Sequence, residues 1–137
     1  MRFHVNFKSG KPVYLQVVDQ VKAAAASGAL RGGEALPSIR PLAEELHLNR
    51  NTIAKAYAEL ENQGVIQTAA GRGCFIADNH ASPLRKDARV KLVTGEIDQA
   101  VIQAHHLQLD RAEFLQLTEE RFDAFAKRRE RALTVKD

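Results

Sequence analysis

The sequence contains one cysteine, Cys74, among 137 residues, so no disulfide can close within a single chain. It has no run approaching the roughly 18 apolar residues that a membrane span needs. It also lacks a charged start followed by an apolar stretch, the pattern of a secretion signal. No phosphate-binding loop, dinucleotide fingerprint or nucleophile elbow is present. These absences favour a cytoplasmic protein with no membrane partner and no cofactor, and they leave an enzyme as the least supported alternative.

Total charge and metal-ligand types say little about function. The formal net charge is +3, a sum too small to identify a nucleic-acid partner. His105 and His106 are adjacent, and neighbouring helical residues point about 100° apart, so we expect no metal site there. Cys74 has no base partner in the pattern and is expected to pack on a strand. A case for DNA must therefore come from where the cations lie.

The N-terminal residues predict a short strand followed by a helix. Residues 2–7 alternate polar and apolar side chains, as strands do. Pro12 suits a helix start and Gly28 a helix end. Between them, apolar residues recur at helical spacing: Tyr14, Val17, Val18, Val21 and Ala25. Residues 31–37 are interpreted as a loop.

Two further helices follow, joined by a short turn. Ser38 is a candidate N-cap for the first and Asn49 for the second, and Gly64 suits the end of the second. The apolar stripe of the first comprises Ile39, Leu42, Ala43 and Leu46, and that of the second comprises Ile53, Ala56, Tyr57 and Leu60. Three helices with so short a last connection predict a helix-turn-helix.

Residues 65–77 contain two short apolar segments around Gly71 and Gly73, which indicates a β-hairpin. A hairpin directly after the third helix of such a core is a wing. The predicted fold is therefore mainly α with a small β-hairpin, and residues 1–78 are expected to form a winged helix-turn-helix DNA-binding domain.

Residues 79–137 are predicted to form a linker and a two-helix segment. One helix ends near Leu107, and Asp110 with Glu113 forms a capping box for the other. The charged tail after Ala126 is expected to fray. Two helices cannot enclose a core, so we expect a second copy to cover their apolar faces. The candidate dimerisation residues are Val93, Ile97, Val101, Phe114, Leu117, Phe122 and Phe125.

The start of the third helix is crowded with polar side chains. In a helix-turn-helix this turn enters the DNA major groove. Arg50 can fork two hydrogen bonds to guanine, and Asn51 can pair with an adenine edge. Thr52 can donate to a phosphate, and Lys55 on the next turn is in reach of the DNA backbone. The alternative is that these side chains are merely solvated.

Five more residues are candidate DNA contacts beside that turn. Arg40 begins the preceding helix and either reaches the duplex or pairs with Glu44 at i+4. Ser38 and Asn49 are caps that can also touch phosphate or base. Gly71 and Arg72 put a cation at the wing tip, where it either enters a narrow minor groove or is only an exposed turn residue.

With these motifs in place, residues 11–77 resemble the GntR family of bacterial transcription regulators. The matching elements are Leu-Pro-Ser-x-Arg at residues 36–40, Leu-Ala at 42–43, the recognition start at 49–52, Glu-x-x-Gly at 61–64 and Gly-Arg-Gly at 71–73. The resemblance implies DNA contacts by Arg40, Arg50, Thr52 and the wing tip.

Some positions depart from the family pattern. Ala54 stands where many members have a second recognition-helix arginine, so one contact is missing. Ile39 and Pro41 replace acidic residues, and Cys74 replaces threonine. The short C-terminal part resembles the YtrA-type branch, in which two helices serve dimerisation and no dedicated ligand domain exists.

The resulting hypothesis is a homodimeric regulator, a repressor in preference to an activator, on a palindromic double-stranded DNA operator. The rival hypothesis is a winged helix used for protein contact without specific DNA binding. The operator sequence, the regulated genes and any small-molecule effector are not readable from these residues.

Overall fold

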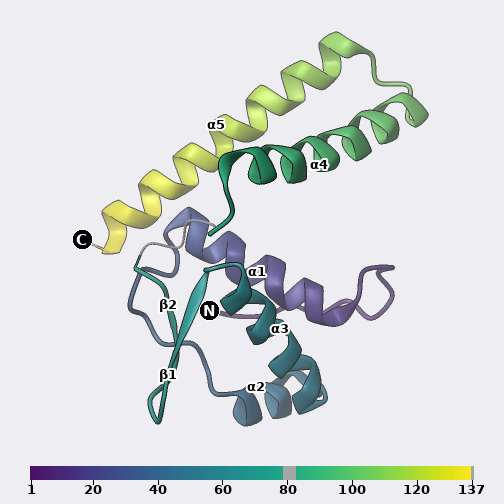
Figure 1. The fold of residues 1–137 in the computed structure, drawn as a ribbon. Helices are drawn as coiled ribbons and strands as arrows, with labels where there is room; N and C mark the ends of the chain where they lie inside the picture. Colours follow the sequence, from purple (N-terminus) through teal and green to yellow (C-terminus); the bar gives the residue numbers. More distant parts are fainter. Residues whose placement is uncertain (79–82, 137) are drawn as a thin grey trace.

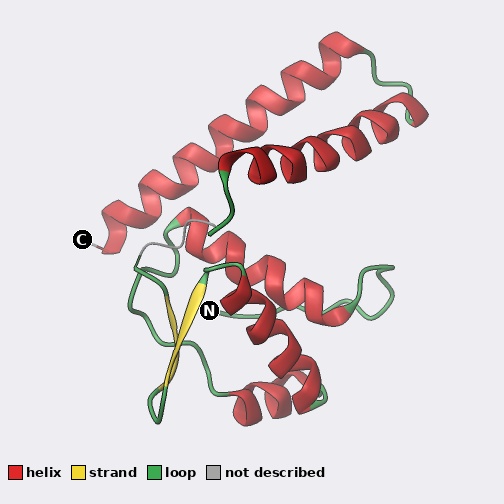
Figure 2. Ribbon diagram, viewed as in Figure 1, coloured by secondary structure: helices red, strands yellow, loops and turns green. Residues whose placement is uncertain are grey.

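The computed structural model describes residues 1–78 and 83–136, so most of the predicted linker lies outside the described residues. The elements are α1 (Val13–Ser27), α2 (Ile39–Leu46), α3 (Arg50–Asn62), β1 (Ile66–Ala69), β2 (Gly73–Ile76), α4 (Lys86–His106) and α5 (Arg111–Lys136). Figures 1 and 2 show two parts: residues 1–78, called the head, and α4 with α5, called the arms. The mainly helical fold with a two-stranded hairpin agrees with the sequence prediction.

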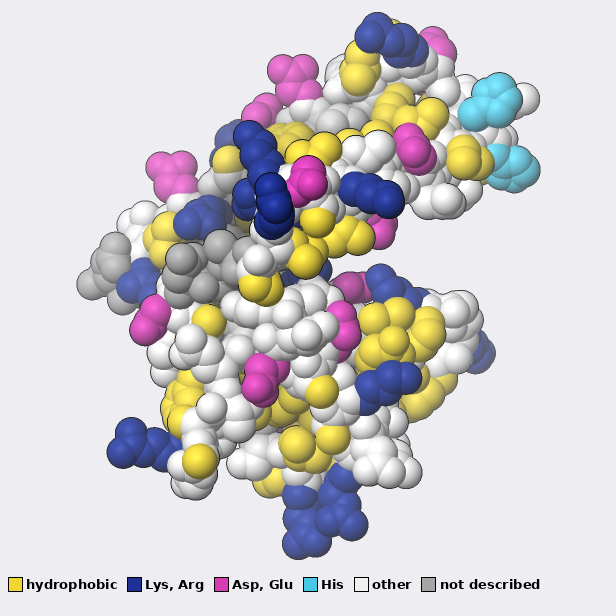
Figure 3. Space-filling view, in the orientation of Figure 1, with side chains coloured by type: hydrophobic (Ala, Val, Ile, Leu, Met, Phe, Trp, Pro, Cys, Tyr) yellow, Lys and Arg dark blue, Asp and Glu magenta, His cyan; other side chains and the backbone are white. Residues whose placement is uncertain are grey.

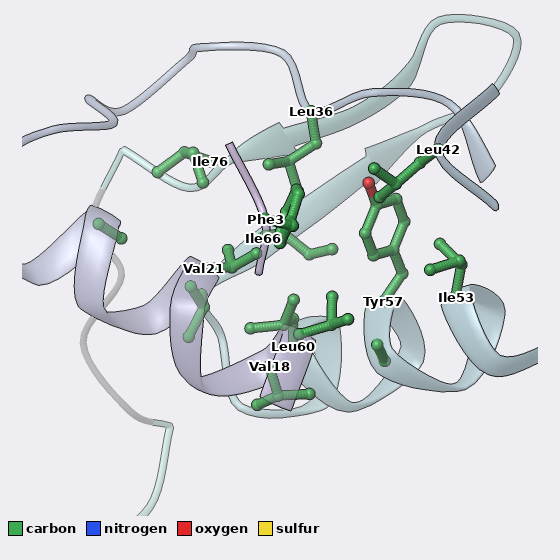
Figure 4. Close-up of a cluster of buried hydrophobic side chains, with 14 of the residues drawn as sticks. Phe3, Val18, Val21, Leu36, Leu42, Ile53, Tyr57, Leu60, Ile66 and Ile76 are labelled. Atoms are coloured by element: carbon green, nitrogen blue, oxygen red, sulfur yellow. The ribbon is translucent and has the colours of Figure 1, made fainter. Parts of the chain in front are cut away.

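The core of the head lies between α1, α2, α3 and the hairpin. Each predicted stripe turns inward: Val17 and Val21 from α1, Leu42 from α2, and Ile53 and Leu60 from α3 are all at most 1% exposed. Figure 4 shows these helices sending their side chains toward Ile66 and Ile76 of the hairpin. Burying several such side chains stabilises the fold by about 1.5–3 kcal/mol each, and it fixes α3 against α1.

An isolated β-bridge extends the wing on the outer side of β2, and the sequence did not indicate it. β1 and β2 pair antiparallel, with Ile66 opposite Ile76. Ala35 bridges Phe75 on the other side of β2, and the N–H of Leu36 donates to the carbonyl of Cys74 at 2.9 Å. The predicted loop at residues 31–37 therefore contains a bridge that the sequence does not indicate, since a single bridged residue produces no alternation. The bridge holds the loop before α2 against the wing.

The predicted strand at residues 2–7 is wrong, because this extended segment lies along α1 and not beside another strand. The side-chain amide of Gln20 exchanges two hydrogen bonds with the backbone of His4, at 2.9 and 2.6 Å. Gln16 does the same with Asn6, at 2.9 Å each. Two extended residues and four helical residues both span about 6 Å. The two glutamines therefore substitute for a neighbouring strand.

The arms confirm the predicted helix limits and the capping box. α4 ends at His106, and the N–H of Glu113 donates to Asp110 Oδ1 at 2.9 Å while the N–H of Asp110 donates to Glu113 Oε1 at 3.1 Å. The expectation that the tail frays after Ala126 is wrong. α5 continues to Lys136, and its last turns contact α1 through Arg129 and Leu133.

Candidate nucleic-acid interface

The turn between α2 and α3 is closed by main-chain hydrogen bonds. The N–H of Leu48 donates to the carbonyl of Ala43 at 2.9 Å, and that of His47 to Glu44 at 3.3 Å. His47 takes the left-handed conformation, with φ 56°. This pairing is a Schellman motif, which ends a helix within a few residues. It brings the start of α3 directly beside α2.

Asn49 caps α3 as the sequence predicted. Its side-chain oxygen accepts a hydrogen bond from the N–H of Asn51 at 2.7 Å. Ser38 occupies the N-cap position of α2, but its side chain makes no capping hydrogen bond. Its hydroxyl is exposed, so the predicted cap is right in position and wrong in hydrogen bonding.

Tyr57 fixes the position of α2 relative to α3. Its hydroxyl donates to the carbonyl of Pro37 at 2.7 Å, and its side chain is 4% exposed. Burial, with a smaller contribution from nearby Cys74, raises the pKa of this hydroxyl well above its usual range. The hydroxyl therefore stays protonated and holds the residue just before Ser38.

Arg40 and Arg50 lie on the same open groove. The groove has a volume of about 660 Å³ and is lined by Arg40, Ala43, Glu44, His47, Leu48, Asn49 and Arg50. Both arginines are exposed, and the described residues offer neither of them a carboxylate within salt-bridge distance. The predicted alternative, an ion pair between Arg40 and Glu44, is therefore absent. Figure 3 shows Lys and Arg side chains projecting at the end of the head where α2 and α3 meet.

The other recognition-helix candidates differ in availability. Asn51 is exposed, whereas Thr52 is half-buried beside the fully buried Ile53. The ammonium of Lys55 lies 4.1 Å from the ring centroid of Tyr14, on α1, a cation–π contact. Lys55 thus already has an intramolecular partner, which the sequence did not indicate.

The wing presents one arginine at its tip. Three residues, 70–72, join β1 to β2, and the N–H of Arg72 donates to the carbonyl of Ala69 at 2.9 Å. Gly71 and Gly73 have φ angles of 76° and 97°, a backbone region that residues other than glycine rarely occupy. The turn therefore needs both glycines, and it leaves the guanidinium exposed to solvent.

The described residues contain no group of three or more His, Cys, Asp and Glu side chains that could hold a metal ion. Cys74 is half-buried against the core, with its Sγ 3.7 Å from the hydroxyl oxygen of Thr68, as expected for a packed strand residue. No helix within the described ranges is long and apolar enough to cross a bilayer.

Three helices, a tight turn between the last two, and a hairpin with an exposed arginine define a winged helix-turn-helix. Residues 13–76 match the model of the bacterial regulatory proteins of the gntR family. The chain is 36% identical over 99 residues to the HTH-type transcriptional repressor YtrA of Bacillus subtilis, covering 72% of this chain and 75% of that protein. The chain belongs to the GntR family, whose members are transcription regulators and not enzymes.

Solved structures agree with this assignment. A transcriptional antiterminator from Listeria monocytogenes EGD-e superposes with a TM-score of 0.79 at 33% identity, covering 91% of this chain and 92% of that one. The DNA-binding domain of AraR, in complex with operator ORX1, superposes with a TM-score of 0.50 at 26% identity, covering 56% of this chain and 99% of that domain. The head therefore has the architecture of a domain that binds operator DNA.

Proposed function

We propose that the protein is a cytoplasmic, homodimeric repressor that binds a palindromic operator in a sequence-specific way. The observation that carries the proposal is the exposed groove shared by Arg40 and Arg50 at the start of α3. Neither arginine has a carboxylate partner within the described residues, so both guanidinium groups remain available to DNA. The similarity to YtrA, which is named a repressor, supports repression as the outcome.

The start of α3 enters the major groove in this proposal. Arg50 reads guanine through a bidentate pair, and the exposed Asn51 reads an adenine edge. Asn49 touches phosphate while it caps the helix, and Thr52 donates to a phosphate near the groove wall. Lys55 contributes to the DNA backbone only if its ammonium leaves the ring of Tyr14.

Residues outside α3 fix its orientation on the duplex. Arg40 and the unused hydroxyl of Ser38, both at the start of α2, bind phosphates on one side of the groove. Gly71 and Arg72 carry the wing into the adjacent minor groove, whose negative potential attracts arginine. Phosphate contacts of this kind give affinity, whereas the α3 contacts give specificity.

In the proposed dimer, the arms of one chain pack against the arms of a second copy. Many of their apolar side chains stay exposed in a single chain: Val93 58%, Ile97 51%, Val101 46%, Leu117 43%, Phe122 71% and Phe125 39%. Phe114 is half-buried. Residues 86–97 also form an apolar groove of about 400 Å³ on α4. Exposed apolar side chains grouped on one part of a protein are typical of a protein interface. A two-fold axis through the arms would place one head on each of two operator half-sites. We therefore propose that residues 1–78 are the DNA-binding domain and that residues 79–137 are the linker and dimerisation segment.

A selection of bound sequences from a random duplex pool tests this function. We expect the full chain to enrich two inverted copies of one short motif, and its affinity for that duplex to fall steeply with salt. A winged helix used for protein contact would enrich no motif. Enrichment of a single motif without an inverted partner would contradict the dimeric palindrome.

A further inference from the structure

Within the described residues, the head and the arms make a close contact at the ends of α1 and α5. Nη1 of Arg129 donates to the carbonyl of Ala26 at 3.0 Å, and Nη2 of Arg31 donates to the carbonyl of Leu133 at 2.6 Å. The side chain of Leu133 lies against Gly28, where an added Cβ would be 3.2 Å from its Cδ2. Each part thus gives an arginine to the other part's helix end. We call Arg31, Arg129 and Leu133 the head–arm contact.

Both arginines bind where helices attract cations. The last carbonyls of a helix lack intrahelical partners, and the helix dipole makes that end partially negative. The last turn of α1 contains no basic residue of its own. Arg129, from 103 positions away, therefore supplies the cation that α1 lacks.

The other approach between the two parts is open. A cleft of about 700 Å³ separates α4 from α1 and the end of α3, with Lys22, Glu59, Leu92 and Val93 among its lining residues. Figure 3 shows this hollow between the arms and the head. Because α4 does not pack closely there, the orientation of the head depends on the contact with α5.

We propose that the head–arm contact sets the spacing of the two operator half-sites. The inference rests on the proposed dimer and on DNA binding by α3. When two copies join through their arms, the angle between head and arm decides how far apart the two α3 starts lie. Successive major grooves recur about 34 Å apart, so a fixed angle admits one spacing and a free angle admits several.

The test compares the full-length double variant Arg129→Ala/Leu133→Ala with wild type. Each is put through selection from a random duplex pool and is then titrated with duplexes that carry the selected motif at altered spacings. In wild type, two extra base pairs should weaken binding by about tenfold or more, because the second half-site becomes unreachable. In the variant, the same motif should be enriched and the loss should be about threefold or less.

Two further variants separate loss of the contact from loss of the fold. Arg128→Ala/Thr134→Ala changes exposed neighbours on the same turns and should keep the wild-type spacing dependence. Arg129→Lys should also keep it, because the carbonyl of Ala26 needs only one donor. Equal spacing dependence in wild type and the Ala/Ala variant would overturn the inference alone. Failure of wild type to enrich any motif would overturn the proposed function, and this inference with it.

Discussion

The hydroxyl of Tyr57, in the middle of α3, donates a 2.7 Å hydrogen bond to the carbonyl of Pro37, just before α2. The bond joins the helix that carries Arg50 to the loop that leads to Arg40. These two arginines share one groove, so a buried tyrosine that touches no DNA sets the distance between them.

Removing the Tyr57 hydroxyl should make the groove less rigid without leaving a cavity in the core. Tyr57→Phe keeps the ring and is expected to lower the free energy of unfolding by about 1 kcal/mol, the net value of one such bond. Urea unfolding followed by circular dichroism measures the change. Tyr14→Phe is the matched control because the Tyr14 hydroxyl makes no hydrogen bond within the described residues, and its ring is only half-buried. Equal destabilisation by the two substitutions would remove the special role of Tyr57.

The same hydroxyl makes the free energy of unfolding depend on pH in the alkaline range. Burial raises the pKa of Tyr57 above its ordinary value, so above about pH 10 the unfolded chain binds fewer protons than the folded one. The free energy of unfolding should then fall as pH rises through that range. Tyr57→Phe should abolish that part of the decline, and a stability curve measured between neutral and strongly alkaline pH checks it.

Arg50 should carry base specificity, not general affinity. Arg50→Ala is expected to cost about 1–3 kcal/mol on the selected duplex and to relax the preference at one base position. Binding to unrelated duplexes should change much less, because in the proposal Arg40 and Ser38 still contact phosphates and Arg72 still enters the minor groove. The comparison uses titrations of selected and scrambled duplexes. Arg111→Ala, at the distant start of α5, is the control and should leave both affinities unchanged.

The wing arginine should behave differently from Arg50. Arg72→Ala removes one cation from an exposed tip and should reduce the slope of log affinity against log salt by about 1. The preferred bases under α3 should stay the same. A repeat of the selection together with a salt series measures both quantities. A changed motif under α3 would mean that the wing orients α3 and does not simply add a contact.

The helices of the head were predictable because local pattern and tertiary burial agree. The stripe of Ile53 and Leu60 recurs at helical spacing in the sequence and is fully buried in the structure. Asp110 and Glu113 needed only their own spacing to predict a capping box. Such features depend on residues a few positions apart, so one sequence contains all the information that they need.

The features that the sequence concealed depend on distant partners. Gln16 and Gln20 substitute for a strand only once residues 4–6 lie along α1. Lys55 lies over Tyr14, 41 positions earlier in the chain, and no helical period predicts that contact. The charged tail is helical to Lys136, and its Arg129 donates to a carbonyl of α1. In each case the partner becomes a neighbour only after folding.

Two left-handed residues at helix ends give different expectations for stability. Gly64 ends α3 with φ 79°, and His47 ends α2 with φ 56°. Gly64→Ala should lower the free energy of unfolding by about 1–2 kcal/mol, since a Cβ is disfavoured in this region. His47→Gly relieves the same strain but frees the unfolded chain, so its net effect should be within about 1 kcal/mol of zero. Thermal unfolding of the two variants measures the contrast, and equal losses would mean that the backbone angle is not the cause.

Phe122 gives the sharpest test of the dimer, because the head offers a matched control. Phe122 is 71% exposed on α5 and Phe7 is 68% exposed near the start of the chain. Phe122→Asp places a charge within the proposed interface, where burying an unpaired carboxylate is costly, so light scattering should report monomers at concentrations where wild type is dimeric. Phe7→Asp adds the same charge outside the interface and should leave the dimer intact.

Operator affinity should fall when the dimer is lost, since each head alone contacts only one half-site. The circular dichroism of both variants should stay like that of wild type, because neither phenylalanine lies in the core of the head. A Phe122→Asp protein that remains dimeric would remove this face of α5 from the interface.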